Sequence, residues 1–141
     1  MYPLANIPVI QLSLDYTKPA QHHYDLAKEL SSLRNKGVLI LGSGNMVHNL
    51  GMINWHNPNG GYDWADEMNA TLKKLILDNH HKELINYSSL GKPALYAIPT
   101  PEHYLPLLYI LGLKEENEKI SFFNDKTLMG SLSMTSVIIS N

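Results

Sequence analysis

The run from Val38 to Asn49 constrains the fold most, because an apolar segment leads there directly into a glycine turn, Gly42-Ser43-Gly44. Val38 to Leu41 is apolar without alternation, which is typical of a central strand covered on both faces in a parallel α/β sheet. A glycine turn after such a strand lets the backbone approach a ligand closely and aims Asn45 and His48 at it. The run therefore predicts an α/β fold with a candidate site at the turn.

Composition limits the classes of function. The chain has 141 residues, of which 44% are hydrophobic, and this is enough for one globular domain over residues 1–141. Its net charge is −2 with the seven histidines neutral, and it has no Lys/Arg cluster, so we expect neither nucleic acid nor a membrane surface as a partner. Since cysteine is absent, any metal must be held by histidine and carboxylate side chains.

No stretch of the sequence has the pattern of an export or membrane segment. The first residues, Met1 to Asn6, contain no basic region followed by an apolar stretch. No apolar run approaches the roughly 20 residues that cross a bilayer. We therefore expect a cytoplasmic chain.

Apolar periodicity predicts alternating strands and helices. Strands are expected over residues 7–14, 38–41, 120–123 and 131–139, with a further extended segment over 94–98. Helices are expected from Thr17 or Lys18 to Leu33, over 45–50, 63–76 and 83–90, and from Pro101 to Leu111. Gly37 and Gly112 are expected to end the first and the last of these helices. A strand, a helix and a strand in succession near the start favour a right-handed crossover unit.

The glycine turn does not match the common nucleotide-binding or hydrolase motifs. A dinucleotide fingerprint needs a third glycine where Val47 stands, and a phosphate-binding loop needs Gly-Lys-Ser or Gly-Lys-Thr, which is absent. A nucleophile elbow would need glycine at the positions of Leu41 and Asn45. Ser43 is therefore not expected to be a hydrolase nucleophile.

Two histidines stand out by their surroundings. His48 follows the glycine turn, and His103 follows Pro99-Thr100-Pro101-Glu102, where two prolines stiffen the approach. Imidazole binds divalent metals and moves protons near neutral pH, so the pair indicates a metal or acid–base site. The alternative for His48 is a capping or core-edge role, and for His103 a solvent-facing place in the first turn of a helix.

Of the remaining histidines, only His56 is a candidate for substrate contact. It stands in a polar loop over residues 55–61, where proline and glycines interrupt regular structure. The others are expected to complement a helix dipole (His80 and His81) or to be solvated on a helix surface (His22 and His23).

Two runs carry a resemblance to a known family: Gly42-Ser43-Gly44-Asn45-Met46-Val47-His48-Asn49 and Pro99-Thr100-Pro101-Glu102-His103-Tyr104-Leu105-Pro106-Leu107-Leu108-Tyr109. Shorter supporting matches are Pro8 to Ser13, Trp55-His56 and Met129 to Met134. With these motifs in this order, the chain resembles the LigB-like class III extradiol ring-cleavage dioxygenases, in particular the 4,5-DOPA dioxygenase branch. The resemblance covers essentially the whole chain.

The resemblance implies an α/β fold with a mixed sheet flanked by helices, and one mononuclear metal per site, Fe(II) or Zn(II). It implies a catechol such as L-DOPA and O2 as small-molecule partners. By motif, His103 is expected to be a metal ligand and His48 the acid/base that handles the catechol protons. Some family members are described with the His48-type residue as a ligand too. Asn45 and His56 are expected to help seat the substrate.

Family members are roughly twice as long as this chain, which resembles their carboxy-terminal portion. Their amino-terminal half supplies two further metal-binding histidines, each after an early strand. We therefore expect an incomplete metal site in the isolated chain, because mononuclear iron oxygenases use three protein ligands. We also expect a sheet edge that the other half would pair. An amino-terminal fragment or a homo-oligomer is the expected partner.

Two other functions fit parts of the sequence. A noncatalytic binding or scaffold protein could keep the same fold, as in the Memo-type relatives of these enzymes. A cofactorless hydrolase could use Ser43 or Ser131 with His48, but no orienting carboxylate is evident from the spacing.

Overall fold

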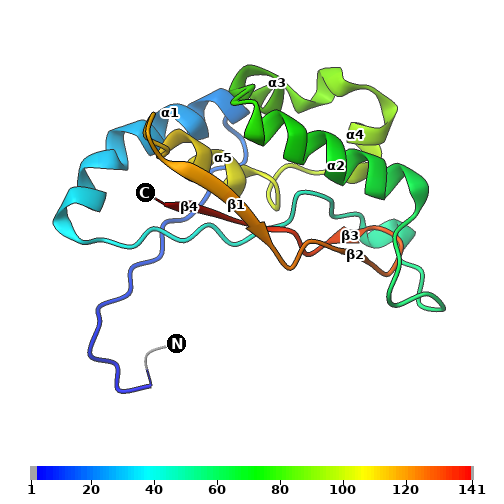
Figure 1. The fold of residues 1–141 in the computed structure, drawn as a ribbon, viewed down its shortest axis with the longest axis horizontal. Helices are drawn as coiled ribbons and strands as arrows, with labels where there is room; N and C mark the ends of the chain where they lie inside the picture. The colour runs from blue at the N-terminus through cyan, green and yellow to red at the C-terminus, as the bar shows by residue number, and fades with distance from the viewer. Residues whose placement is uncertain (1–2, 141) are drawn as a thin grey trace.

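Helices gather above two short β-ladders in this structure, a computed structural model that describes residues 3–140 (Figure 1). The α-helices are α1 (Ala20–Leu30), α2 (Asp63–Leu77), α3 (His81–Ile85), α4 (Lys92–Ala97) and α5 (Leu105–Gly112). The 3₁₀ helices are η1 (Ser31–Lys36), η2 (Leu50–Met52) and η3 (Tyr87–Leu90). The strands are β1 (Lys119–Phe123), β2 (Thr127–Leu128), β3 (Leu132–Ser133) and β4 (Ser136–Ser140). The predicted α/β class is confirmed.

Both sheets in the described part of the chain are two-stranded and antiparallel. β1 pairs with β4 in a register that places Lys119 opposite Ser140. β2 pairs with β3, and β3 also forms an isolated bridge from Leu132 to His48. The carboxy-terminal strands therefore reach the segment that follows the glycine turn.

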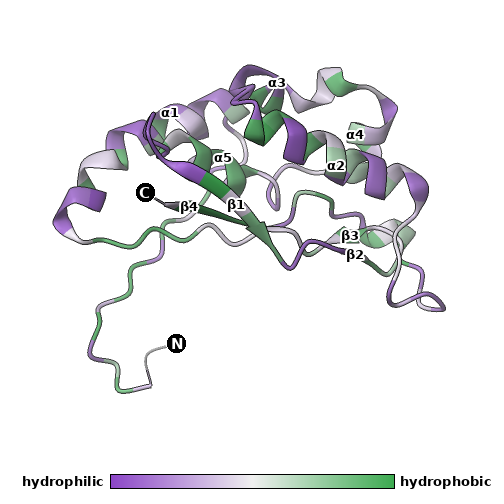
Figure 2. Cartoon of the chain, viewed as in Figure 1, coloured by the Kyte–Doolittle hydropathy of each residue, from purple (hydrophilic) through white to green (hydrophobic). Residues whose placement is uncertain are grey.

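α5 lies at the centre of the core because it is apolar on every side. Its Leu108 and Leu111 are fully buried, and Figure 2 shows hydrophobic residues along the helix. α1 packs across α5 at Gly112, where a Cβ would lie 2.6 Å from the carbonyl oxygen of Tyr24 and 2.9 Å from the Cβ of Ala27. Glycine therefore sets how closely α1 and α5 approach. Neither α5 nor any other helix within residues 3–140 has the length and apolarity to cross a bilayer.

Most predicted helices are confirmed, with shifted ends. The helix predicted over residues 17–33 is found as α1 followed by η1, and the one over 63–76 is found as α2. The helix predicted over 83–90 is found as α3 followed by η3, and the one over 101–111 is found as α5. α5 begins at Leu105, not at Pro101, because a turn occupies the residues between them. Gly37 ends η1 with a left-handed φ of 76°, a conformation that glycine adopts without strain.

Two other local predictions are wrong. Residues 45–50 do not form the predicted helix, because the backbone N–H groups of Asn45 and His48 donate to carbonyl groups outside the segment. Residues 94–97 belong to α4 and are not extended. Pro93 stands in the first turn of α4, where its missing N–H costs nothing, and good helix formers follow it.

The strands predicted over residues 7–14 and 38–41 form no ladder. Their apolar side chains are exposed, Ile10 by 92% and Leu39 by 68%. An apolar run becomes a strand only if a neighbour exchanges backbone hydrogen bonds with it, and no described residue does so here. The predicted crossover unit is therefore not formed. The strand predicted over 120–123 is confirmed as β1, whereas the one over 131–139 divides into β3 and β4.

His23 is buried, so the prediction that it would be solvated is wrong. Its side chain shares one face of α1 with Ala27 and is 1% exposed at the contact with α5. Its Nδ1 lies 3.2 Å from the hydroxyl oxygen of Tyr109, and its Nε2 has no hydrogen-bond partner among the described residues. Burial lowers the pKa of His23 below its ordinary value of 6.5, and the neighbouring His22 acts in the same direction.

We predict that the fold loses stability as the pH falls below 6.5. The unfolded chain protonates His23 near its ordinary pKa, whereas the folded chain protonates it only at lower pH. The contribution of His23 to the free energy of unfolding is thus fully present above the pKa of the unfolded chain. As the pH falls from there to the pKa of the folded chain, this contribution is lost by up to about 1.4 kcal/mol per pH unit for one proton. Chemical denaturation between about pH 5 and about pH 8 measures this dependence. His23→Gln should flatten it, and equal slopes in the two proteins would contradict the burial of His23.

Candidate functional site

The glycine turn packs directly on the segment that carries His103. The backbone N–H of Asn45 donates to the carbonyl oxygen of His103 over 2.8 Å. A Cβ on Gly44 would overlap that same oxygen, and a Cβ on Gly42 would lie 2.8 Å from the carbonyl oxygen of Pro106. Any larger residue at Gly44 would push the two segments apart, so the glycines are required by close contact.

His48 is held between α4 and β3. Its backbone N–H donates over 2.8 Å to the carbonyl oxygen of Ala97, the last residue of α4. Its backbone also bridges to Leu132 of β3. His103 lies in the turn between α4 and α5, close before α5 begins. Neighbouring elements therefore fix the backbone from which each imidazole projects.

The imidazole rings of His48 and His103 stack on each other. Their centroids are 3.8 Å apart and their planes differ by 16°. The two histidines that the sequence singled out are thus brought together by the fold. A metal ion lies in the plane of the imidazole that binds it, about 2.0–2.1 Å from the nitrogen. Two nearly parallel planes this far apart share no such point, so in this arrangement one ion binds one of the rings.

The surroundings of His48 favour its neutral form. Burial lowers the pKa of His48, and a positive charge on the ring of His103 lowers it further. The carboxylate of Glu102 acts in the opposite direction on His48. The hydroxyl of Thr100 donates to Glu102 over 2.6 Å and lowers the pKa of this carboxyl, so it stays ionised beside the rings. A neutral imidazole offers one lone pair for a metal or a proton.

The described residues offer an incomplete set of donors for a mononuclear metal. Imidazole nitrogens suit Fe(II) and Zn(II), so His48 and His103 fit part of such a site. However, residues 3–140 contain no group of three or more histidine, cysteine, aspartate or glutamate side chains that could hold an ion. A mononuclear non-haem iron site in an oxygenase uses three protein ligands and keeps positions open. The pair therefore does not complete the site.

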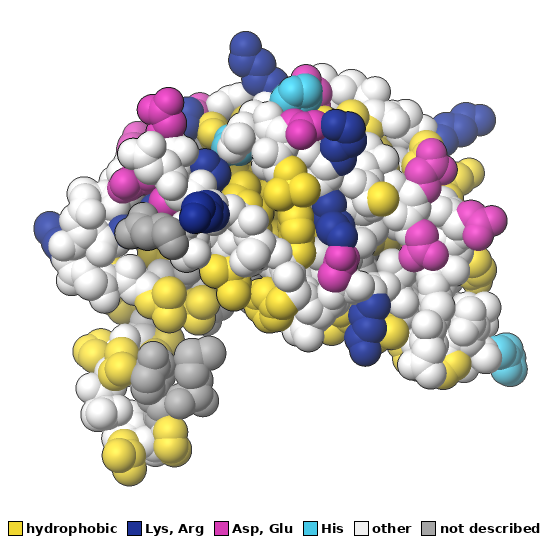
Figure 3. Space-filling view, in the orientation of Figure 1, with side chains coloured by type: hydrophobic (Ala, Val, Ile, Leu, Met, Phe, Trp, Pro, Cys, Tyr) yellow, Lys and Arg dark blue, Asp and Glu magenta, His cyan; other side chains and the backbone are white. Residues whose placement is uncertain are grey.

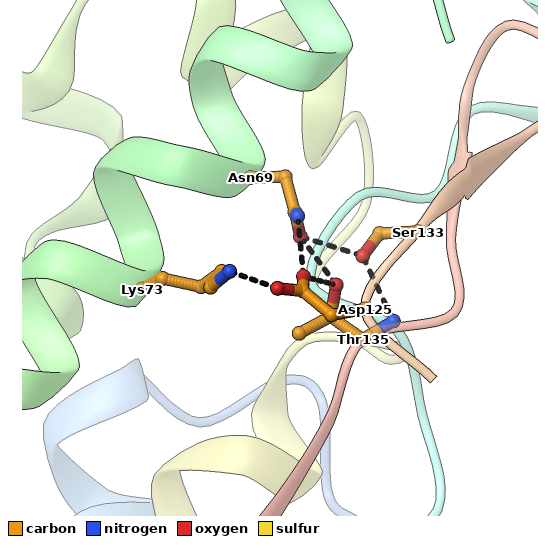
Figure 4. Close-up of polar contacts among 5 residues, drawn as sticks. All are labelled: Asn69, Lys73, Asp125, Ser133 and Thr135. Carbon is orange, nitrogen blue, oxygen red and sulfur yellow. Dashed lines mark hydrogen bonds and ion pairs between the residues drawn. The ribbon is translucent and has the colours of Figure 1, made fainter. Parts of the chain in front are cut away.

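Ser133 of β3 joins the glycine turn to α2, and sequence reasoning missed it. Its backbone N–H donates to the carbonyl oxygen of Val47 over 2.9 Å, and its carbonyl oxygen accepts from Nδ2 of Asn45 over 2.7 Å. Its hydroxyl donates to Oδ1 of Asn69 on α2 over 2.6 Å (Figure 4). One buried serine thus holds the chain on both sides of Met46, immediately before His48.

Asn69 belongs to a polar cluster that ties α2 to the carboxy-terminal strands (Figure 4). The hydroxyl oxygen of Thr135 lies 3.0 Å from both Asn69 Oδ1 and Asp125 Oδ1, and its single proton serves one of them at a time. Lys73 of α2 pairs with Asp125 and lowers the pKa of this carboxyl. The residues come from separate segments, so no spacing in the sequence connects them.

The two residues expected to seat a substrate differ in their placement. Asn45 is half-buried beside the stacked rings, where Ser133 occupies its Nδ2 and leaves its Oδ1 to accept a hydrogen bond. His56 is exposed in a loop, and its backbone N–H donates to Oδ1 of Asn54 over 3.1 Å. The structure does not bring the ring of His56 onto the stacked pair.

Neither serine of the hydrolase alternative is placed beside a base. Ser131 is fully buried, and its hydroxyl donates to the carbonyl oxygen of Asn49 over 2.7 Å. Ser43 is exposed in the glycine turn. A nucleophilic serine needs a histidine within hydrogen-bond reach and a carboxylate that orients this histidine. This arrangement gives the hydrolase alternative no support.

We predict that Gly44→Ala destabilises the fold and moves the two imidazoles apart. The added Cβ overlaps the carbonyl oxygen of His103, so the turn must shift, at a cost of about 1–3 kcal/mol. Gly51→Ala is the matched control, because its Cβ would meet only the side chain of Asn49, at 3.3 Å. Chemical denaturation gives the free energy of unfolding of both variants. Equal stability would contradict the close approach at Gly44.

Comparisons with known proteins identify the family of the chain. The sequence profile of the LigB family, described as "Catalytic LigB subunit of aromatic ring-opening dioxygenase", matches residues 1–137. A protein of Escherichia coli (strain K12) named 4,5-DOPA dioxygenase extradiol is 42% identical over 144 residues, which cover 99% of this chain and 52% of that protein. A protein of the same name from Mirabilis jalapa is 39% identical over 119 residues, which cover 84% of this chain and 44% of that protein.

A solved structure extends the likeness to the fold. The crystal structure of an uncharacterized protein from Escherichia coli K12 matches with a TM-score of 0.87 and 42% sequence identity, over 97% of this chain and 57% of that chain. This match confirms the predicted LigB-like fold. The chain spans about half the length of the relatives it matches. On the profile and on these identities, the chain belongs to the LigB family of aromatic ring-opening dioxygenases.

Proposed function

We propose that this chain contributes the carboxy-terminal part of the active site of an extradiol dioxygenase that opens the ring of a catechol, such as L-DOPA, with O2. The observation that carries the proposal is the stacked pair His48 and His103 in a chain of the LigB family. Relatives named 4,5-DOPA dioxygenase extradiol support a catechol as the substrate. A near-neutral chain without a basic cluster also suits a small aromatic ligand.

We assign His103 to the metal, one Fe(II) or Zn(II) per site, and His48 to proton transfer. The nearly parallel ring planes favour this division, because a second bond from His48 to the same ion would require the stack to open. When bound, the metal would supply Lewis acidity and a position for the catechol oxygens and for O2.

His48 then accepts a proton from a catechol hydroxyl at a ring nitrogen. Its backbone is fixed by Ala97 and Leu132, so the imidazole is positioned before the substrate arrives. Positioned acid–base groups contribute about 10²–10⁴-fold to a rate. Oδ1 of Asn45 accepts a hydrogen bond from the substrate, whereas His56 contacts the substrate only if its exposed loop moves toward the stacked pair.

A complete site needs ligands beyond the described residues of this chain. We propose that the amino-terminal half of the family domain supplies them, and a second copy of this chain is the alternative source. A noncatalytic binding or scaffold function, as in Memo-type relatives, is the second candidate, and the incomplete donor set favours it. Under that alternative, His48→Ala would leave the biological activity of the chain intact.

Oxygen uptake with L-DOPA and Fe(II) tests the proposed function. The chain is co-expressed with the amino-terminal half of its Escherichia coli relative, and the metal-loaded complex is assayed with an oxygen electrode. We predict that His103→Ala abolishes uptake and lowers the metal content measured by inductively coupled plasma mass spectrometry. His48→Ala should slow uptake by about 10²–10⁴-fold with metal retained.

The matched control for these variants is His80→Ala. His80 is exposed between α2 and α3, where its Nδ1 lies 3.6 Å from Oε1 of Glu83, and its loss should leave uptake and metal content unchanged. A metal-loaded complex of the unaltered chain that consumes no oxygen would contradict the dioxygenase proposal.

A further inference from the structure

Asn69 of α2 is the residue on which the polar cluster of Figure 4 converges. Its side chain is buried, and its Oδ1 lies 2.6 Å from the hydroxyl oxygen of Ser133 and 3.0 Å from that of Thr135. An amide oxygen has two lone pairs, so it can accept from both hydroxyls. The Nδ2 of Asn69 lies 3.4 Å from Oδ1 of Asp125. One buried amide thus turns its oxygen toward two hydroxyls and its nitrogen toward a carboxylate.

Asp125 fixes this orientation of the amide. In the flipped orientation the amide oxygen would face the carboxylate, and both groups only accept hydrogen bonds. Lys73, one turn along α2 from Asn69, pairs with Asp125 and lowers the pKa of this carboxyl, so it stays ionised. Figure 3 shows basic and acidic side chains mixed over the viewed face of the molecule. The carboxylate therefore depends on its ion pair with Lys73 and not on a patch of one charge.

The bond from Ser133 to Asn69 anchors β3 to α2. The hydroxyl of Ser133 donates to Asn69 and accepts from the backbone N–H of Thr135 over 3.2 Å, so it is used in both roles. β3 has only two residues and pairs with the two residues of β2. So short a ladder is marginal by itself. The position of β3 therefore depends on the helix that holds Ser133.

The backbone of Ser133 carries this anchor into the candidate site. Its carbonyl oxygen accepts from Nδ2 of Asn45 over 2.7 Å, and its N–H donates to the carbonyl oxygen of Val47 over 2.9 Å. The preceding residue, Leu132, bridges to His48. A displacement of Ser133 would therefore turn the amide of Asn45 and shift the backbone of His48 together.

We propose that Asn69 is a positioning residue of the active site, which holds Ser133 so that Asn45 and His48 keep the orientation that the reaction needs. Because Ser133 occupies Nδ2 of Asn45, the ligand group that meets Asn45 must donate a hydrogen bond, as a hydroxyl or an ammonium group does. The proposal rests on the proposed function for the reaction that it serves, whereas its contacts are testable without activity.

Two variants separate positioning from a contribution to stability alone. Ser133→Ala and Thr135→Val each remove one buried hydroxyl that contacts the same oxygen of Asn69. Among the described residues, however, Thr135 makes no hydrogen bond to the glycine turn. Both variants should lower the free energy of unfolding in chemical denaturation, and only Ser133→Ala should change the site. Thr135→Val is therefore the matched control.

Nuclear magnetic resonance of the folded, isolated chain reads the site without a metal or a partner. In Ser133→Ala, the side-chain amide protons of Asn45 should exchange with water about fivefold faster, because their acceptor is displaced. The cross-peaks between the rings of His48 and His103 should weaken in the same variant. Both signals should be unchanged in Thr135→Val.

A swap of the amide and the carboxylate tests the orientation of Asn69. Asn69→Asp alone places a second carboxylate beside Asp125 and should disturb the same signals as Ser133→Ala. Adding Asp125→Asn should restore them, because the amide then donates to the introduced carboxylate, which still accepts from Ser133. The introduced carboxylate also lies one turn from Lys73 on α2, where opposite charges attract.

Oxygen uptake by the metal-loaded complex with the amino-terminal half of the Escherichia coli relative gives the effect on the reaction. Ser133→Ala should lower kcat by up to about 10²-fold, the cost of a misplacement of about 1 Å. Its metal content should stay unchanged, because no bond of Ser133 reaches His103 among the described residues.

Unchanged signals of Asn45 and His48 in Ser133→Ala overturn the proposal, and so does an equal change in Thr135→Val. If a single variant fails to fold, the double variant Asn69→Asp with Asp125→Asn decides, and its failure to fold with restored signals overturns the proposal. If the signals change as expected but the complex of the unaltered chain consumes no oxygen, the result contradicts the proposed function and supports the contacts assigned to Asn69.

Discussion

The site depends on the approach of Gly44 to the carbonyl oxygen of His103, where a side chain on the glycine would overlap that oxygen. This contact brings the glycine turn within hydrogen-bond distance of the turn before α5, and the bond from the N–H of Asn45 closes it. The stacking of His48 on His103 follows, because each imidazole projects from one of the two joined segments. Without the contact, two motifs far apart in the sequence would have no common site.

The rest of the fold supports this contact from two sides. Ser133 bonds to the chain before His48 through its backbone and to Asn69 through its hydroxyl, so α2 holds the turn in place. On the other side, α5 supports the turn, because a Cβ on Gly42 would lie 2.8 Å from the carbonyl oxygen of Pro106.

The sequence predicted the parts of the structure that depend on local chemistry. Helical periodicity located α2 and α5, and the motifs around His48 and His103 identified the two residues that the fold brings together. The failures concern properties set by distant neighbours. Residues 7–14 and 38–41 have the pattern of strands but no ladder partner among the described residues. His23 lies on an amphipathic helix, yet it is buried because Gly112 lets α1 approach α5 closely. Ser133 gave no signal, since its role exists only where β3, α2 and the glycine turn meet.

The fold itself, without a metal or a partner, places the two imidazoles in contact. Nuclear Overhauser effects between the ring protons of His48 and His103 measure this contact directly in the isolated chain. We predict strong cross-peaks between the two rings, since their centroids lie 3.8 Å apart. Absence of such cross-peaks in a folded sample, with resolved ring signals of both histidines, would contradict it.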